Sequence, residues 1–332
     1  MTRGAVLFLT GALVAVFSAP TAAYLKLGTR VGTRTITLKW SQFPIRYFLT
    51  DRGTTGVTST QLQQAVQAAF STWAAVPTAT TSSEFVGFTL ANPSSRDGAT
   101  VIGFQNRPDL ERTLGATSFI IDTTTGAIVE SDIFFNTAFP WSGSAQGETG
   151  LFDLQSIALH EIGHLQGLAH SAMGETELRA GGRRVIAAEA VMFPIAFSAG
   201  TILGRTLKAD DIAGIGDIYP NSTYTRNTGS ISGKVTKNGT GVLGAHVIAF
   251  DMRTQTLVGG FSLSEDGNFV IAGLDPGPHV VRVEPLDDGD IESFFDATMN
   301  IDVNFQPQFY DKIVVVPKGG GTAGVELKVV AK

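Results

Sequence analysis

Hydrophobic residues recur at helical spacing in two stretches of the first 220 residues. The runs 61–76 and 151–159 both show this spacing, and each predicts an amphipathic helix. The positions that define the two apolar faces are Val66, Ala69, Phe70, Trp73, Leu154, Ile157 and Ala158. Asp153 suits the positive end of the second helix, and Gly167 can adopt the left-handed conformation that ends it.

The pattern changes near residue 220, from helical spacing to short alternating runs. The segment 221–229 is polar and turn-prone, which predicts a linker. Turn clusters separate the later runs, which are 230–236, 245–251, 257–264, 268–272, 279–284, 294–311, 313–316 and 324–330. Short strands at this spacing predict an all-β antiparallel sandwich over 230–332.

The first residues have the pattern of a secretory signal. Arg3 supplies the positive end, 4–17 an apolar stretch, and 18–23 a small-residue cleavage region. The apolar stretch is shorter than the roughly 20 residues of a membrane span. We therefore expect a signal peptide over 1–23, cleavage after Ala23, and an exported chain without stable membrane insertion.

Composition narrows the class of protein further. The 332 residues allow two domains, and they include no cysteine, which excludes disulfides and thiolate metal ligands. Low cysteine usage together with a signal favours a bacterial exported protein. The net charge of −6 comes without a basic cluster, so nucleic-acid binding is not expected. We expect a monomer.

Three of the five histidines lie within eleven residues, in the pattern H-E-x-x-H-x-x-G-x-x-H. His160 and His164 are four residues apart, so they share one face of the predicted helix. A turn at Gly167 can bring His170 back toward them. Three imidazoles with one open position are typical of a catalytic zinc, whereas a structural zinc has four protein ligands.

Glu161 lies next to the first histidine, about 100° around the helix. There it can face the open position and deprotonate a water, although it cannot easily be a ligand. The two remaining histidines, His246 and His279, lie in the strand-rich region. We expect them to be ordinary surface or turn residues and not ligands.

With these motifs the chain resembles the metzincin metalloproteases, and within them the matrixins. Ser171 follows the third histidine as in matrixins, 190–194 resembles the methionine turn with Met192, and 207–215 resembles the closing helix. The resemblance covers about 40–220 and implies an α+β fold, with a twisted, mostly parallel sheet, long helices and zinc in the cleft. A matrixin-like domain is therefore expected over 24–220. The sandwich resembles the carboxypeptidase regulatory-like, transthyretin-type domain.

Some positions depart from the matrixin pattern. Thr117 and Phe134 stand where collagenase-type members have histidines for a second zinc, so a second zinc is not expected. Asp122, Glu130 and Asp132 fit either calcium ligands or solvated acidic turn residues, and both interpretations stay open. The extra residues 175–189 predict a loop or short hairpin near the substrate side.

The sequence therefore predicts a secreted zinc endopeptidase that acts on peptides or proteins. Zinc is held by His160, His164 and His170, and Glu161 is the general base and acid. The substrate pairs with the strand 114–120, and residues after Met192 form the pocket beyond the cleaved bond. The alternatives are a non-catalytic surface or adhesion protein with a structural metal site, and an aminopeptidase. For the sandwich, adhesion, substrate binding and passive support stay open, with passive support favoured.

Overall fold

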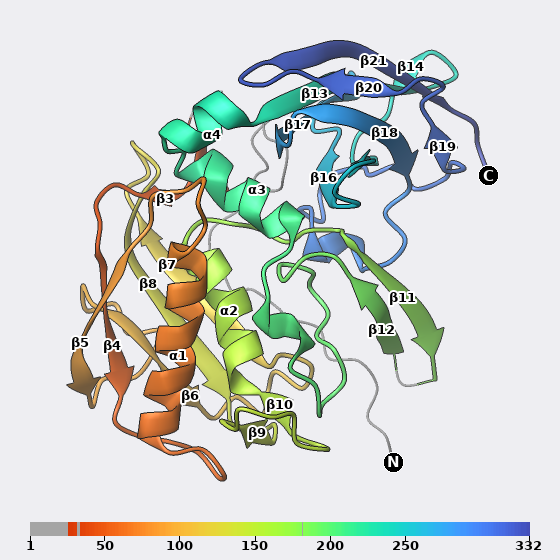
Figure 1. Ribbon diagram of the computed structural model, residues 1–332. Coiled ribbons are helices and arrows are strands. Elements are labelled where there is room, and N and C mark those ends of the chain that lie inside the picture. The colour runs from red at the N-terminus through yellow and green to blue at the C-terminus, as the bar shows by residue number, and fades with distance from the viewer. Residues whose placement is uncertain (1–25, 32–33, 181) are drawn as a thin grey trace.

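The computed structural model describes residues 26–31, 34–180 and 182–332 (Figure 1). The signal peptide expected over 1–23 lies outside these residues. Within the described part of the chain, no helix has both the length and the apolar character needed to cross a membrane.

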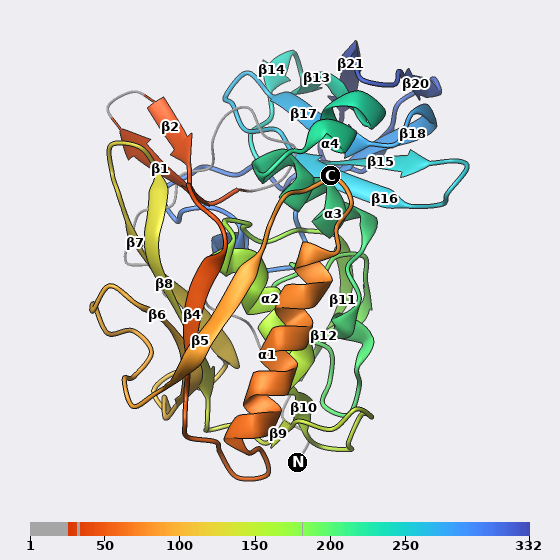
Figure 2. The same ribbon diagram turned by 60° about the vertical axis from the view of Figure 1, so that its left-hand side comes forward.

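Six strands of the described chain form the main sheet of the first part. Five run parallel in the order β3-β8-β6-β4-β5, and β7 pairs antiparallel with β8 at the edge (Figure 2). Their bounds are β3 Lys39–Trp40, β4 Ile45–Thr50, β5 Ser83–Thr89, β6 Thr100–Gln105, β7 Gly115–Ile121 and β8 Ala127–Asn136. This arrangement agrees with the mostly parallel sheet that the matrixin resemblance implies.

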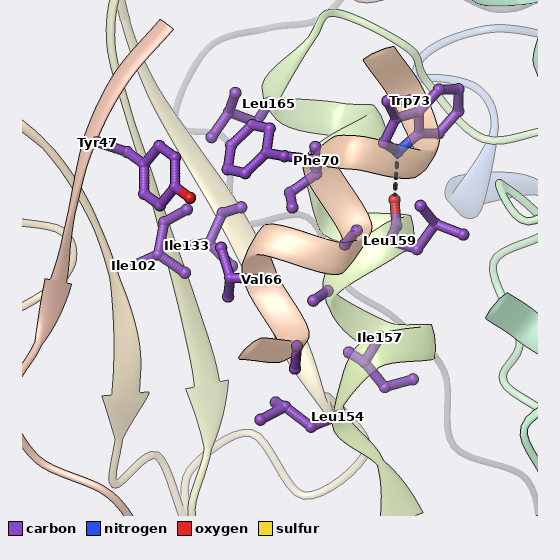
Figure 3. Packing of buried hydrophobic residues seen from close by; sticks show 14 of the residues in the cluster. Tyr47, Val66, Phe70, Trp73, Ile102, Ile133, Leu154, Ile157, Leu159 and Leu165 are labelled. Atoms are coloured by element: carbon purple, nitrogen blue, oxygen red, sulfur yellow. Dashed lines mark hydrogen bonds between the residues drawn. The ribbon is translucent and has the colours of Figure 1, made fainter. Parts of the chain in front are cut away.

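The helices α1 (Ser59–Ala74) and α2 (Leu154–Leu165) pack against this sheet and against each other (Figure 3). The indole Nε1 of Trp73 donates to the carbonyl of Leu159 at 2.8 Å, which fixes the two helices relative to each other. The predicted run 61–76 locates the apolar face of α1 correctly but misplaces its ends. The start is set by Thr58, whose side chain caps the helix together with Gln61.

Short elements complete the first part of the chain. They are β1 (Gly28–Val31), β2 (Arg34–Thr37), β9 (Trp141–Ser142), β10 (Phe152–Asp153), β11 (Gly174–Arg179), β12 (Gly182–Ala188), η1 (Leu203–Arg205) and α3 (Ala209–Ile218). Strands β11 and β12 form an antiparallel hairpin, one of the two forms predicted for 175–189. The closing helix is α3, which begins two residues after the start of the predicted run 207–215.

The segment predicted as a linker contains the short helix α4 (Ser222–Asn227). Asn221 caps it, because the Asn221 side chain accepts hydrogen bonds from Thr223 and Tyr224. The segment is therefore partly helical, and its role as a linker stays a prediction. The polar residues that indicate a turn also include a good helix cap.

Two sheets follow α4, and they share one hydrophobic core. The first has the order β14-β13-β17, with β21 paired to β13, and the second has the order β16-β15-β18-β19, with β20 paired to β18. Their bounds are β13 Gly229–Lys237, β14 Thr240–Gly241, β15 His246–Asp251, β16 Leu257–Phe261, β17 Asn268–Leu274, β18 Gly277–Glu284, β19 Gln308–Phe309, β20 Val314–Val316 and β21 Gly321–Val329. In Figures 1 and 2, α3 lies between these sheets and the helices α1 and α2.

The predicted run 294–311 contains little strand. It holds only β19, and it follows the single turn η2 (Ile291–Ser293). Phe294 and Phe295 pack with Ala172 and Phe261 in a cluster separate from the core of the two sheets. The start of this run therefore packs against the first part of the chain near Ala172, whereas Phe305 further along lies in the core of the two sheets.

The expectation that His246 and His279 are surface or turn residues was wrong. Both side chains are buried, and both belong to strands. The Nδ1 of His246 lies 3.1 Å from Oε1 of Glu284, and the Nδ1 of His279 lies 3.1 Å from the carbonyl of Gly277. Since each histidine has a hydrogen-bond partner inside the fold, burial is tolerated.

Candidate metal centre

Helix α2 carries the first two histidines, and its ends are fixed by specific residues. At the start, Asp153 accepts from the backbone N–H of Ser156 at 2.8 Å. At the end, Gly167 has a φ of +103°, and a Cβ there would lie 2.4 Å from the carbonyl oxygen of Leu38. Glycine is required on both grounds, and the turn that it makes leads the chain back to His170.

The three histidines of the motif meet at one point. The Nε2 atom of His164 lies 3.0 Å from that of His160 and 3.2 Å from that of His170. All three side chains are buried, with 1–4% of their surface exposed. Within the described chain, they form the one group of three or more metal-ligating side chains.

The other ring nitrogen of each histidine faces a backbone carbonyl. The Nδ1 atoms of His160, His164 and His170 contact the carbonyl oxygens of Val191, Leu168 and Ser293 at 2.7, 2.7 and 2.6 Å. A carbonyl can only accept, so each Nδ1 carries a proton and each neutral ring directs the lone pair of Nε2 inward.

Burial keeps these rings neutral. It lowers the pKa of His160 to about 3 and that of His170 to about 4, and it also lowers the pKa of His164. Three converging lone pairs without a proton between them need a cation. Tetrahedral zinc with bonds of about 2.0–2.1 Å separates its ligand nitrogens by about 3.3 Å, so the donor set fits zinc.

Glu161 lies between α2 and the edge strand β7. Its Oε2 atom accepts from the hydroxyl of Thr117 at 2.7 Å, and the same hydroxyl lies 3.1 Å from the carbonyl oxygen of Glu161. Its Oε1 atom is buried and has no hydrogen-bond partner among the described residues. Burial raises the pKa of Glu161 to about 8, although the bond from Thr117 lowers it. A buried carboxylate oxygen without a partner is suited to receive a proton donor such as water.

Asp211 of α3 holds the methionine turn in place. Its carboxylate accepts from the backbone N–H groups of Val191, Met192 and Lys208 at 2.8, 3.1 and 2.8 Å. Because the carbonyl of Val191 in turn contacts His160, Asp211 acts on the first histidine through this turn.

Met192 is buried in the core and packs against α2 at Gly163. A Cβ at Gly163 would lie 2.3 Å from its sulfur, so the glycine between the two helical histidines leaves room for the methionine. An apolar pocket adjoins His160 on the same side. Its walls come from α2 and from residues on both sides of Met192, including Ile157, Val191, Phe193 and Ile195.

The structure therefore brings together the three predicted ligands and places Glu161 beside them. The sequence did not predict three groups that contact the site residues or the methionine turn, namely Thr117, Asp211 and the carbonyl of Ser293. Thr117 attracted notice only as a departure from the second-zinc pattern. Asp211 was visible within the closing-helix motif, whereas nothing in the local sequence marks Ser293.

The acidic residues considered for calcium hold loops instead. Asp122 accepts backbone N–H bonds within its own turn, and Asp132 accepts from Ser94 and Val101, each at 2.7 Å. Glu130 accepts from a backbone N–H of the same 94–101 loop. In the part of the chain that the structure describes, these carboxylates do not gather into a ligand set of three.

Asp132 makes the stability of the fold depend on pH. Burial raises its pKa from 3.8 to about 7, N–H donors of the loop lower it, and Glu130 and Asp97 raise it. The folded chain thus binds this proton more tightly than the unfolded chain, so stability falls as the pH rises from about 4 to about 7. Relative to Asp132→Asn, we expect the unfolding free energy of the wild type to fall by about 2 kcal/mol between about pH 5 and about pH 7.5. Urea denaturation at both pH values measures this difference, and a constant difference would contradict the prediction.

Comparison with known proteins identifies a family whose model matches this chain. A family model described as Matrixin matches residues 39–220. A search of curated proteins found no match. Among solved structures, the Bacillus anthracis TIE protein aligns at 16% identity with a TM-score of 0.23, over 32% of this chain and 17% of that chain. This alignment spans less than a fifth of that protein and carries no argument about fold or activity.

Proposed function

Because this chain belongs to the matrixin family through residues 39–220, we propose that it is an exported zinc-dependent endopeptidase. The family supports zinc-dependent peptidase activity. One observation supports a catalytic role for these particular residues. The lone pairs of His160, His164 and His170 point toward one another, and the neighbouring Glu161 has a buried carboxylate oxygen without a hydrogen-bond partner among the described residues. The first feature suits a metal, and the second suits proton transfer.

When held by the three histidines, zinc supplies Lewis-acid polarisation of the scissile carbonyl and acidifies the attacking water. Glu161 takes a proton from that water and later gives it to the departing amine, so that it acts first as base and then as acid. Thr117 holds Oε2 of Glu161, which leaves Oε1 for the proton transfer.

Edge strand β7 is the proposed binding strand for the substrate. It pairs with β8 on one side, and no other strand of the described chain pairs with its second edge. An extended peptide can add to such an edge through backbone hydrogen bonds. The pocket beside His160, with walls from Val191 and Phe193, then receives the side chain after the cleaved bond. Its lining favours apolar side chains.

We also propose that the chain is exported, because of its signal pattern. Its proposed substrates are peptides or proteins, and it is proposed to act as a monomer. The two sheets after α4 are proposed to be a carboxypeptidase regulatory-like domain. Calcium is left out of the proposal because the candidate carboxylates hold backbone loops.

Metal removal tests the activity. We expect the purified chain to contain about one zinc and to cleave members of a peptide library at internal bonds. A chelator should abolish cleavage and added zinc should restore it, and His164→Ala should lose both metal and cleavage. Mass spectrometry of the products and metal analysis provide the measurements. A zinc-loaded chain that cleaves no member of the library would favour the structural-site alternative, and release of single terminal residues would favour an aminopeptidase.

A further inference from the structure

The third histidine is oriented by a residue outside the part of the chain that matches the family. The carbonyl that contacts His170 belongs to Ser293, 123 positions later in the chain. The carbonyls that contact His160 and His164 belong to Val191 and Leu168, which lie inside the matched residues 39–220. One of the three orienting contacts therefore comes from the region after α4.

We infer that this region completes the metal centre, with the Ser293 carbonyl and the Phe294 ring as positioning groups for His170. The carbonyl holds the proton on Nδ1, which directs Nε2 toward the metal. The ring of Phe294 meets that of His170 edge-on, with 6.3 Å between centroids and 73° between planes. The inference rests on the proposed zinc site, and it replaces the passive role expected for the C-terminal sheets.

Hydrophobic packing around Phe294 stabilises the contact between Ser293 and His170. Phe294 is buried in a cluster with Leu286 and Phe261 from the C-terminal region and with Ala172, two residues after His170. The backbone N–H of Phe294 donates to the carbonyl of Ile291 at 2.9 Å, which closes the turn that carries Ser293. The position of the carbonyl is therefore fixed by its own turn and by a core that both regions share.

The hairpin β11–β12 holds the same segment on another side. The backbone N–H of Thr176 donates to the Asp288 carboxylate at 2.6 Å, and the Thr176 hydroxyl donates to the Asp288 carbonyl at 2.9 Å. The hairpin lengthens the chain between His170 and the methionine turn. Its contact with Asp288 ties that insertion to the segment that orients His170.

A second connection joins the two regions next to the same ligand. The hydroxyl of Ser171 donates to Asp210 at 2.6 Å, and the other oxygen of Asp210 accepts from the backbone N–H of Gly259 in β16 at 2.7 Å. A Cβ at Gly259 would lie 2.9 Å from the sulfur of Met173, so the strand approaches closely because this residue is glycine. The residues after His170 are thus fixed to the C-terminal sheets at two places.

Two full-length variants test the inference. Phe294→Ala removes the edge contact and the packing under Ser293, whereas Phe269→Ala removes an equally large buried ring from β17, in the core of the two sheets. We expect Phe294→Ala to weaken zinc binding by about 10- to 100-fold. We expect Phe269→Ala to lower the melting temperature but to change zinc affinity by less than about twofold, because its packing does not involve the ligands.

Zinc affinity is measured by competition with a chelator, and the Nδ1 protons are followed by NMR of ¹⁵N-histidine in the zinc-loaded protein. The His170 proton should shift in Phe294→Ala while those of His160 and His164 stay unchanged. Ser293→Gly provides a milder variant, since it leaves the core intact and only loosens the backbone that carries the carbonyl. We expect it to weaken zinc binding about threefold.

Equal losses of zinc affinity in Phe294→Ala and Phe269→Ala would overturn the inference, because both would then act through general stability. An unchanged His170 signal in Phe294→Ala would overturn it as well. If Phe294→Ala does not fold, wild-type zinc affinity in Ser293→Gly overturns it. In each case a wild type that still binds zinc and cleaves peptides leaves the proposed function intact, whereas a wild type without zinc overturns both.

Discussion

Glu161→Gln is expected to lower kcat by about 10²- to 10⁴-fold while zinc content stays at about one per chain. Glutamine has nearly the same shape, and its amide oxygen can still accept the bond from Thr117. However, its amide group cannot take a proton from the attacking water. The variant therefore removes the proposed proton transfer and keeps the histidines, since Glu161 is not among the clustered ligand atoms.

The measurement compares kcat and KM on the best substrate of the peptide library, together with the zinc content of each protein. Glu84→Gln is the matched control, because Glu84 is an exposed glutamate of β5 that pairs with Arg46. We expect it to behave like the wild type. A Glu161→Gln variant with more than about a tenth of wild-type kcat would exclude Glu161 as the general base.

The sequence predicted the centre of the site because its signals are local. His160 and His164 share one helix, and the turn at Gly167 is a property of a single glycine, so helical geometry alone brings the ligands together. The matrixin resemblance extended the prediction of the site to Met192 and to the closing helix. In both cases the residues that matter lie close together in sequence or in a recognisable motif.

The remaining contacts could not be predicted, since they join distant segments through the backbone. Ser293 contributes a carbonyl, which every residue has, so its identity carries no signal. Thr117 acts only because β7 passes beside α2. The apolar run that begins at Phe294 predicted a strand, but Phe294 and Phe295 fill a space between the two regions, and that space arises only once both have folded.

Asp211→Ala is expected to cause the largest loss of stability among single substitutions near the site. Asp211 is buried, and three backbone N–H groups, from Val191, Met192 and Lys208, depend on its carboxylate. A buried donor without a partner costs about 1–3 kcal/mol. Burial raises the pKa of Asp211 to about 7, so removing the carboxylate also relieves a desolvation cost. We expect a net loss of about 3 kcal/mol.

Asp211→Ala should also weaken zinc binding, because Asp211 holds the turn whose Val191 carbonyl orients His160. We expect zinc affinity to fall by about 10- to 100-fold. Urea denaturation in the presence of a chelator isolates the loss of stability from the loss of metal, and chelator competition measures the latter. Asp217→Ala on the same helix is the matched control, since Asp217 is only partly buried and its partners, Lys26 and the hydroxyl of Tyr224, lie outside the methionine turn. We expect it to cost about 1–2 kcal/mol and to leave zinc affinity unchanged. If the two variants lose similar stability and bind zinc equally well, the methionine turn does not depend on Asp211, and the orientation of His160 must come from the packing of Met192 against Gly163.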